Sequence, residues 1–443
     1  MRPNHPLGSG IFFRLKCRLL ILGLLCALAA APAEAAVRLI VRVQGGALVL
    51  NTVCILLGCT VQYPLGDSQG QVFLVTAPLN LTANLLLSVP GVLDVELDSI
   101  GQTMGAVQTG APAALYDATP VNYYGTTVRE GYVTQLAAQI IGLATTQGAF
   151  GVKGSGIVAV IDTGVDSTHP ALANALVPGY DFTRSQAGEA DEKGDIQQST
   201  TAVIDQSTTA VVDQSTTAVI DSYTASQLNQ PQYQAFGHGT MVSGVVRLVA
   251  PGAMIMPLKA FHADGTGYAS DVIRAVYFAV HNHARILNMS FSFKSSSMEL
   301  NQALNYAKAN GLISVAAAGN DGQQTTVYPA GYSGTVMGVA STSNADTLST
   351  FSNYGPNLVW VSAPGEGIVT FYPYGTYAAT WGTSFSTPFV GGAAALLLDV
   401  QSTCTESQAA QALAHAKYIN SYLGNGRLDL YQAVQAWRQA NGL

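Results

Sequence analysis

The segment Gly-Thr-Ser-Phe-Ser-Thr-Pro-Phe, residues 382–389, is followed at once by a run of small and apolar residues, Val390–Val400. This pattern predicts a flexible turn that leads into a helix. A hydroxyl at such a helix start is open to reaction, and the positive end of the helix dipole favours negative charge that develops there. Ser384 is therefore the candidate nucleophile. The alternative is a Ser/Thr-rich helix entry without chemistry.

Two further stretches carry the residue types that activate a serine. Ile157–Val160 is an apolar strand that runs into Ile161-Asp162-Thr163-Gly164, and Gly237-His238-Gly239-Thr240 starts a helix-like run of small residues. An aspartate at the end of a buried strand, with a histidine and a serine at helix starts, supplies the parts of a Ser-His-Asp triad. We expect Asp162 to orient His238, and His238 to take the proton of Ser384.

The motifs Asp-Thr-Gly, Gly-His-Gly-Thr and Gly-Thr-Ser-x-Ser-Thr-Pro, in this order, resemble those of the subtilisin-like serine proteases. The resemblance is firm over residues 150–440. It implies a secreted serine endopeptidase that cleaves peptides and proteins through an acyl-enzyme. Two other functions stay open, a catalytically silent peptide-binding relative and a peptide ligase or macrocyclase, in which an amine attacks the acyl-enzyme before water does.

Strand-like and helix-like segments alternate through this region. Strands are expected at Ile157–Ile161, Met254–Lys259, Ile286–Met289, Ile313–Ala317 and Val336–Ala340, and helices at residues 240–249, 270–283 and 298–310. This alternation predicts an α/β fold, with a mainly parallel sheet flanked by helices on both faces. Catalytic groups of such sheets gather beyond the carboxyl ends of the strands, which is where Asp162 lies.

The resemblance also implies an oxyanion hole. Ala316-Ala317-Ala318-Gly319-Asn320 matches the corresponding segment of the family, so Asn320 is expected to donate its side-chain amide beside the backbone N–H of Ser384. Gly319 is assigned to substrate binding. The alternative is an ordinary Gly-Asn turn after a strand.

A peptide substrate is expected to bind as an added extended strand. The segments Gly265, Thr266, Gly267 and Ser290, Phe291, Ser292 resemble the two backbone segments that form the family's cleft. The family commonly has glycines after Ser290, whereas this chain has Ser292 and Phe293. We expect this bulk to narrow the pocket for the residue before the cut bond.

The N-terminus has the layout of a secretory signal peptide over residues 1–35. Basic residues up to Arg18 precede the apolar run Leu19–Ala31 and the small-residue site Ala33-Glu34-Ala35. We expect export, to the extracellular space or the periplasm, with no membrane attachment after cleavage. An uncleaved anchor is the alternative.

Residues 36–99 alternate as βαββαβ, which suggests a small α+β ferredoxin-like domain. Its place before a subtilisin-like domain resembles the family's propeptide, which assists folding, inhibits the cleft and is cut away. A ligand-binding accessory domain is the alternative.

Residues 100–125 are rich in Gly, Ala, Thr and Pro and are interpreted as a linker with the processing site. Glu130–Thr145 is predicted as one amphipathic helix of the catalytic domain, residues 126–443.

An insertion over residues 184–234 contains three near-identical octads, at 198–205, 206–213 and 214–221. Each is expected to add a short strand or hairpin, or to form a solvated loop; a calcium ladder of their aspartates is a weaker alternative. Ala202–Asp205 copies Ala159–Asp162. Only Asp162 continues into Thr-Gly, the turn that the site requires, so it is preferred over Asp205.

Composition limits the partners. Charged residues are only 10% and the net charge is −7, without a basic stripe, which argues against a nucleic-acid partner.

Cys54 and Cys59 are expected as a disulfide or two free thiols rather than a zinc site, and Cys404 as a buried structural thiol. The family's tight calcium loop is missing after residue 240, so no cofactor is expected; a weak calcium site elsewhere stays open. We expect a monomer.

Overall fold

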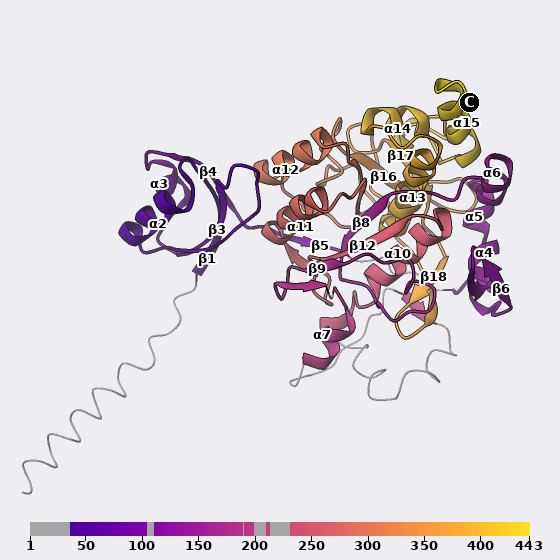
Figure 1. Cartoon of the computed structure of the whole chain (residues 1–443), viewed down its shortest axis with the longest axis horizontal. Helices are drawn as coiled ribbons and strands as arrows, with labels where there is room; N and C mark the ends of the chain where they lie inside the picture. Colours follow the sequence, from indigo (N-terminus) through magenta and orange to yellow (C-terminus); the bar gives the residue numbers. More distant parts are fainter. Residues whose placement is uncertain (1–35, 104–109, 189, 199–209, 213–230) are drawn as a thin grey trace, which may run out of the picture. The chain divides into compact units, whose positions relative to one another are not determined.

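Two units make up the part of the chain that the computed structural model describes, which comprises residues 36–103, 110–188, 190–198, 210–212 and 231–443 (Figure 1). The first unit ends at Leu97 and omits residues 64–72, which belong with Asp98–Leu443 to the second unit. The signal peptide predicted over residues 1–35 lies outside the described residues.

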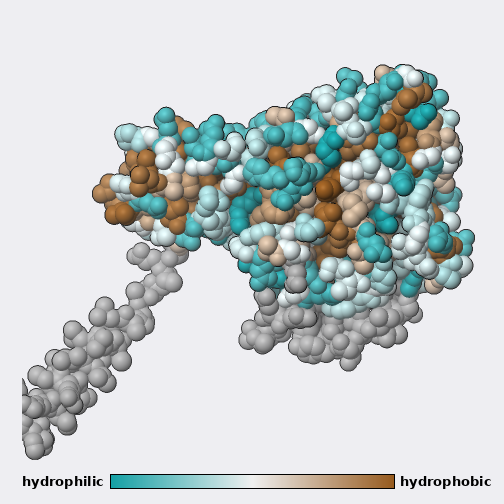
Figure 2. Space-filling view, in the orientation of Figure 1, coloured by the Kyte–Doolittle hydropathy of each residue, from teal (hydrophilic) through white to brown (hydrophobic). Residues whose placement is uncertain are grey.

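The first unit is a four-stranded sheet with two helices. Its elements are β1 (Ala36–Val43), α2 (Gly46–Leu57), β2 (Thr60–Pro64), β3 (Val72–Pro78), α3 (Ala83–Leu87) and β4 (Val92–Leu97). The sheet order is β2-β3-β1-β4, with β1 and β4 antiparallel. This arrangement is the ferredoxin-like fold that the sequence predicts. The outer face of α2 exposes Leu48, Ile55 and Leu56, and hydrophobic residues gather on this unit in Figure 2.

A disulfide closes the end of α2. Gly58 takes the left-handed conformation, with φ 74°, and returns the chain so that the Cα atoms of Cys54 and Cys59 are 4.4 Å apart. The structure thus shows one of the two states that the sequence left open for this pair. In the second unit, Cys404 is buried, and burial raises the pKa of its thiol to about 12.

The second unit is built on an eight-stranded sheet in the order β10-β9-β12-β8-β14-β15-β16-β17. The strands are β8 (Ile157–Asp162), β9 (Gly179–Asp181), β10 (Gln186–Gly188), β12 (Met254–Lys259), β14 (Ile286–Met289), β15 (Ile313–Ala317), β16 (Met337–Thr342) and β17 (Val361–Pro364). Seven neighbouring strands are parallel, and β10 runs antiparallel to β9. The predicted mainly parallel α/β sheet is confirmed.

Four helices of this unit form two packed pairs. The first pair is α10 (His238–Val249) with α13 (Thr383–Val400), and the second is α11 (Ala269–His281) with α12 (Met298–Ala309). Helix α13 packs on β14, β15, β16 and β17. It is long and apolar enough to cross a membrane, but 89% of it is buried inside the unit, so it is a core helix. The C-terminal helices are α14 (Glu406–Leu413) and α15 (Leu430–Ala440).

Part of the repeat-containing insertion joins a second sheet. Ala210–Val212 of the second octad forms β11, which pairs antiparallel with β19 (Thr376–Thr380); β19 in turn pairs with β18 (Ile368–Tyr372). The octads are otherwise outside the described residues, apart from Gln198 at the end of α7 (Lys193–Gln198). The Asp205 alternative and the aspartates of the calcium ladder also lie outside the described residues.

The single helix predicted over Glu130–Thr145 is wrong. The structure has three short helices, α4 (Glu130–Thr134), α5 (Leu136–Ile140) and α6 (Leu143–Phe150). Gln135 is extended, with ψ 148°, and its buried side-chain amide donates to the carbonyls of Tyr132 and Val369, both at 2.7 Å. Gly142 is left-handed, with φ 71°. The long-range bond to Val369 and the left-handed Gly142 interrupt the helix at two points.

The stretch 100–125, interpreted as a linker, contains several short elements. These are β5 (Ile100–Gln102), η1 (Ala113–Tyr116) and β6 (Pro120–Tyr123), which pairs with β7 (Thr126–Arg129). Strand β5 pairs antiparallel with β13 (Thr266–Tyr268). Because its partner lies more than 150 residues later in the chain, local composition gives no sign of this strand.

The contact between α10 and α13 predicts a sharp difference between two glycines. A Cβ added at Gly392 would lie 2.6 Å from the Cβ of Val249, whereas a Cβ at Gly148, in α6, meets no atom within 4 Å. Gly392→Ala should lower the free energy of unfolding by about 1–3 kcal/mol through overpacking. Gly148→Ala should leave it unchanged or raise it by about 0.5–1 kcal/mol.

Chemical denaturation measures both changes, and a Ser384→Ala background removes the nucleophile that the sequence predicts. The three tryptophans of the chain, Trp360, Trp381 and Trp437, all lie in the second unit, so their fluorescence reports on its unfolding. Equal stabilities of the two variants would contradict the packing described for α10 and α13.

Candidate active site

A buried aspartate–histidine pair lies at the carboxyl end of the sheet. Asp162 is the last residue of β8 and His238 is the first of α10. His238 Nδ1 is 2.8 Å from Asp162 Oδ1, and the two side chains are 0% and 1% exposed. The Thr163 N–H donates to the same carboxylate oxygen at 2.7 Å. Because that oxygen accepts, the neutral imidazole carries its proton on Nδ1 and its lone pair on Nε2.

Ser384 lies in the first turn of α13, directly after a turn that requires glycine. Gly382 has φ 140° and ψ 157°, a conformation that residues with a side chain rarely adopt. The Ser384 side chain is buried, and its hydroxyl donates to the carbonyl of Ser290 at 3.1 Å. The ring of the next residue, Phe385, is 5.1 Å from the His238 ring, measured between centroids. The turn thus brings Ser384 into the neighbourhood of His238.

The hydroxyl of Thr103 occupies the space beside the imidazole. Its Oγ1 is 3.0 Å from His238 Nδ1 and 3.3 Å from Nε2, and it donates to the Ser290 carbonyl at 2.8 Å. The Thr103 and Ser384 hydroxyls therefore share one acceptor. In this arrangement Asp162 and His238 are in direct contact, and Ser384 is connected to them through Ser290 and Thr103.

Asn320 has a defined orientation beside the nucleophile. Its Oδ1 accepts from the backbone N–H and from the hydroxyl of Thr383, both at 2.9 Å. A backbone N–H can only donate, so the oxygen rather than the nitrogen of the amide must face Thr383. The other end of the amide is then its NH2 group, the kind of donor that an oxyanion needs. Asn320, Gly319 and Ser384 all line one cavity of about 740 Å³.

A short extended segment of the chain itself lies between the two backbone segments assigned to substrate binding. On one side β5 pairs with β13, and the Thr103 N–H donates to the Gly265 carbonyl at 2.9 Å. On the other side Gln102 and Ser292 exchange two backbone hydrogen bonds, both of 2.9 Å. Gly265–Gly267 and Ser290–Ser292 thus hold a peptide strand between them, with Thr103 directed at His238.

Glu192 was not singled out by the sequence, yet it joins the chain segments around both catalytic candidates. Its carboxylate is fully buried. It accepts from the Gly237 N–H at 3.0 Å, from the Thr163 hydroxyl at 3.1 Å and from the Thr240 hydroxyl. The Thr163 hydroxyl in turn accepts from the Gly239 N–H at 3.0 Å. The residues on both sides of His238 are therefore tied to the residue after Asp162.

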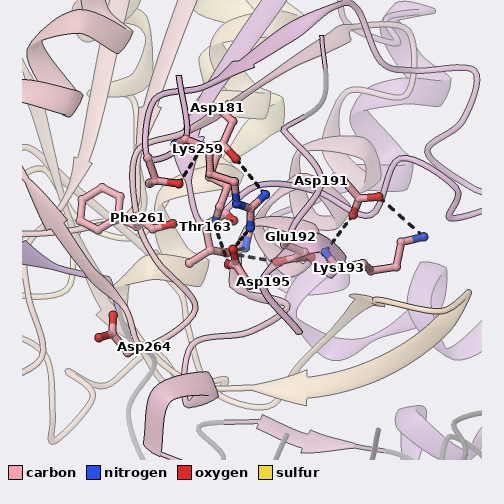
Figure 3. Close-up of polar contacts among 12 residues, drawn as sticks. Thr163, Asp181, Asp191, Glu192, Lys193, Asp195, Lys259, Phe261 and Asp264 are labelled. Atoms are coloured by element: carbon pink, nitrogen blue, oxygen red, sulfur yellow. Dashed lines mark hydrogen bonds and ion pairs between the residues drawn. The ribbon is translucent and has the colours of Figure 1, made fainter. Parts of the chain in front are cut away.

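Lys259 also binds the turn that follows Asp162, at the carbonyl of Thr163. This buried last residue of β12 donates from Nζ to the carbonyls of Thr163 and Phe261, at 2.7 and 2.8 Å, and pairs with Asp195 at 2.7 Å. Figure 3 shows Glu192, Asp195 and Lys259 gathered around Thr163. Burial raises the pKa of Glu192 and lowers that of Lys259, because the charged forms lose hydration.

The two residues differ in how visible they are in the sequence. Lys259 ends a strand that is otherwise apolar, and a lysine at a buried strand end is a signal for a structural or functional charge. Glu192 lies in the insertion, among other polar residues, and no local pattern marks it. Only the fold reveals that it lies between Thr163 and Gly237.

Comparison with known proteins shows the family of this chain. The model of the subtilase family matches residues 154–433. Thermitase of Thermoactinomyces vulgaris is 33% identical over 296 residues, which cover 64% of this chain and 90% of thermitase. Subtilisin of Bacillus pumilus is 31% identical over 302 residues, covering 64% of this chain and 93% of that protein.

A thermophilic serine proteinase of Bacillus sp. (strain AK1) is 32% identical over 289 residues, which cover 62% of this chain and 61% of that protein. The family match covers more than half of the chain, and it includes the strand that ends in Asp162 and the helix starts with His238 and Ser384. The chain therefore belongs to the subtilase family and is a serine-type endopeptidase.

Proposed function

We propose that this endopeptidase cleaves peptide bonds through an acyl-enzyme on Ser384, with His238 as the base and Asp162 as its partner. The observation that supports this most is the buried 2.8 Å contact between His238 Nδ1 and Asp162 Oδ1. The carboxylate keeps the proton on Nδ1, leaves the lone pair on Nε2 and stabilises the imidazolium that forms during the reaction.

In this mechanism His238 Nε2 takes the hydroxyl proton while the Ser384 oxygen adds to the carbonyl carbon of the substrate. The carbonyl oxygen becomes negatively charged and accepts from the Asn320 amide and the Ser384 N–H; one such side-chain donor contributes about 3–4 kcal/mol. The imidazolium then protonates the leaving amine as the C–N bond breaks. Water repeats the sequence on the acyl carbon, releases the acid and restores Ser384.

Residues 36–103 act as an intramolecular inhibitor in this proposal. The contacts of β5 on both sides of the cleft, and the Thr103 hydroxyl beside the imidazole, support it, because a substrate would need the same places. When this segment leaves, rotation about the Ser384 Cα–Cβ bond moves its hydroxyl from the Ser290 carbonyl toward His238. The signal-like residues 1–35 support secretion, and the mature enzyme is proposed to be a monomer without a cofactor.

The register of β5 supports a proposal for the bond that is cut during maturation. In an antiparallel pair, moving two residues forward along one strand corresponds to moving two residues backward along its partner. Gln102 pairs with Ser292, and the carbonyl of Ser290, two residues back from Ser292, accepts from the Ser384 hydroxyl. We therefore assign the self-cleavage to the bond between residues 104 and 105.

Glu192 is proposed to position the catalytic groups without touching substrate. It holds Gly237, before the base, and Thr163, after Asp162, with one carboxylate. A small displacement of such groups is costly, because about 1 Å of misplacement is enough for a 100-fold loss in rate. Its effect should appear in kcat rather than in KM.

Removing the nucleophile tests the proposed chemistry. The Ser384→Ala protein should stay unprocessed and should not react with a fluorophosphonate probe, whereas the parent protein should self-cleave and become labelled. Labelling and trimming of the Ser384→Ala protein at the parental rate would exclude Ser384 as the nucleophile. A parent protein that folds but does not react would indicate the silent peptide-binding relative.

The mature N-terminus tests the assigned bond. Intact mass and N-terminal sequencing of the self-processed protein should give a chain that begins at Gly105. A first cut more than two residues away from this bond would show that the strand register of β5 does not guide the cleavage.

Substituting Glu192 tests its positioning role. Glu192→Gln keeps the shape but turns one acceptor oxygen into an NH2 group, which repels the donors of Gly237, Thr163 or Thr240. In the mature enzyme, kcat on a peptide substrate should fall about 10–100-fold, with little change in KM. Asp191→Asn, at the neighbouring residue, should have no such effect. An unchanged kcat, or a loss confined to KM, would refute the role of Glu192.

A further inference from the structure

One residue of β5 fits its place only because it has no side chain. A Cβ added at Gly101 would lie 2.6, 2.7 and 2.9 Å from Cε1, Cζ and Cδ1 of the Phe293 ring. Real Cβ atoms essentially never approach other atoms so closely. Gly101 is not among the glycines with positive φ, so its backbone would accept any residue. The glycine is required by the space beside Phe293 rather than by the backbone conformation.

The Phe293 ring has little freedom to move aside. It is 2% exposed, and its centroid lies 5.9 Å from that of Phe291 in an edge-to-face contact. Phe291 packs on Phe261 at 4.7 Å. The Phe293 backbone exchanges two hydrogen bonds with Tyr328, of 2.7 and 2.9 Å. Interiors of this density resist added volume, so a side chain at position 101 meets a fixed wall.

The partner of Gly101 in β13 is also a glycine that has no room for a side chain. Gly101 pairs directly with Gly267 of β13, where a Cβ would lie 2.5 Å from the carbonyl oxygen of Ala260 and 2.6 Å from Cδ1 of Phe261. Neighbouring positions of the peptide strand differ. Ile100 is 58% exposed and Gln102 is also exposed, so their side chains face outward. The restriction therefore falls on one position of the bound strand.

We infer that Phe293 makes this protease select glycine at the position that Gly101 occupies, two residues before the residue whose side chain contacts His238. With the cut assigned after residue 104, this is the fourth residue on the N-terminal side of the cleaved bond. The selection among substrates rests on the proposed function, whereas the fit of Gly101 beside Phe293 does not. Phe293 is then a specificity-determining residue, because its ring fills the space that a side chain at this position would need.

The inference can be tested inside the full chain, which presents its own segment to the cleft. In a Ser384→Ala background, which prevents cleavage, Gly101→Leu should expel β5, and amide hydrogen exchange at Gln102, Thr103 and Ser292 should accelerate at least 10-fold. Adding Phe293→Gly to Gly101→Leu should restore most of the protection. Gln102→Leu adds the same side chain one residue along, where it faces outward, and should leave exchange of the segment slow.

This readout needs no catalysis, so it separates the inference from the proposed function. Exchange of the β8 amides controls for the fold, because a Gly101→Leu protein that misfolds loses protection there as well. Slow exchange in Gly101→Leu, or no recovery on adding Phe293→Gly, would overturn the assignment of Phe293.

The catalytic counterpart uses the mature enzyme and peptides that copy residues 100–107. Replacing the glycine at position 101 of the peptide by alanine or leucine should lower kcat/KM about 10–200-fold, the range for a pocket that rejects small apolar groups. Replacing the isoleucine at position 100 should not. In Phe293→Gly the leucine peptide should recover. If the parent enzyme cuts the glycine and leucine peptides equally well, the selection for glycine is wrong; if it cuts neither while the exchange result holds, the proposed function fails and the fit of Gly101 stands.

Discussion

The contact between Asp162 and His238 is the interaction on which the site depends. Both side chains are buried, where a charge that lacks a partner is costly, so the pair must form with good geometry. The pair forms where β8 ends and α10 begins. Glu192 and Lys259 both bind Thr163, which follows Asp162, and Glu192 also binds Gly237, which precedes His238. The position of His238 thus rests on a small buried network rather than on one bond.

The second feature of the site is a strand from the same chain. Strand β5 takes backbone hydrogen bonds from both walls of the cleft, which is how an extended peptide of almost any sequence is held. Backbone pairing gives affinity without selectivity, and selectivity must come from side chains that meet the strand. In this protein Phe293 meets it at Gly101 and His238 meets it at Thr103. This one chain segment is therefore the basis of the proposals on both substrate binding and selectivity.

Local patterns predicted much of this molecule, and long-range contacts account for what they missed. The apolar runs gave the central strands within about two residues, and the motifs around Asp162 and His238 indicated a contact that the structure contains. The helix break at Gln135 depends on a bond to Val369, and β5 depends on Thr266–Tyr268; neither partner is near in sequence. Glu192 lies in an insertion of polar residues, so nothing around it distinguishes its buried carboxylate.

The contact with Asp162 is expected to hold the His238 proton on Nδ1 and so to leave the lone pair on Nε2. Nitrogen-15 NMR of histidine-labelled Ser384→Ala protein measures this directly, with His238→Gln to assign the signal. We expect a protonated Nδ1 with a low-field proton resonance that disappears in Asp162→Ala. A ring protonated on Nε2, or a spectrum that Asp162→Ala leaves unchanged, would contradict it.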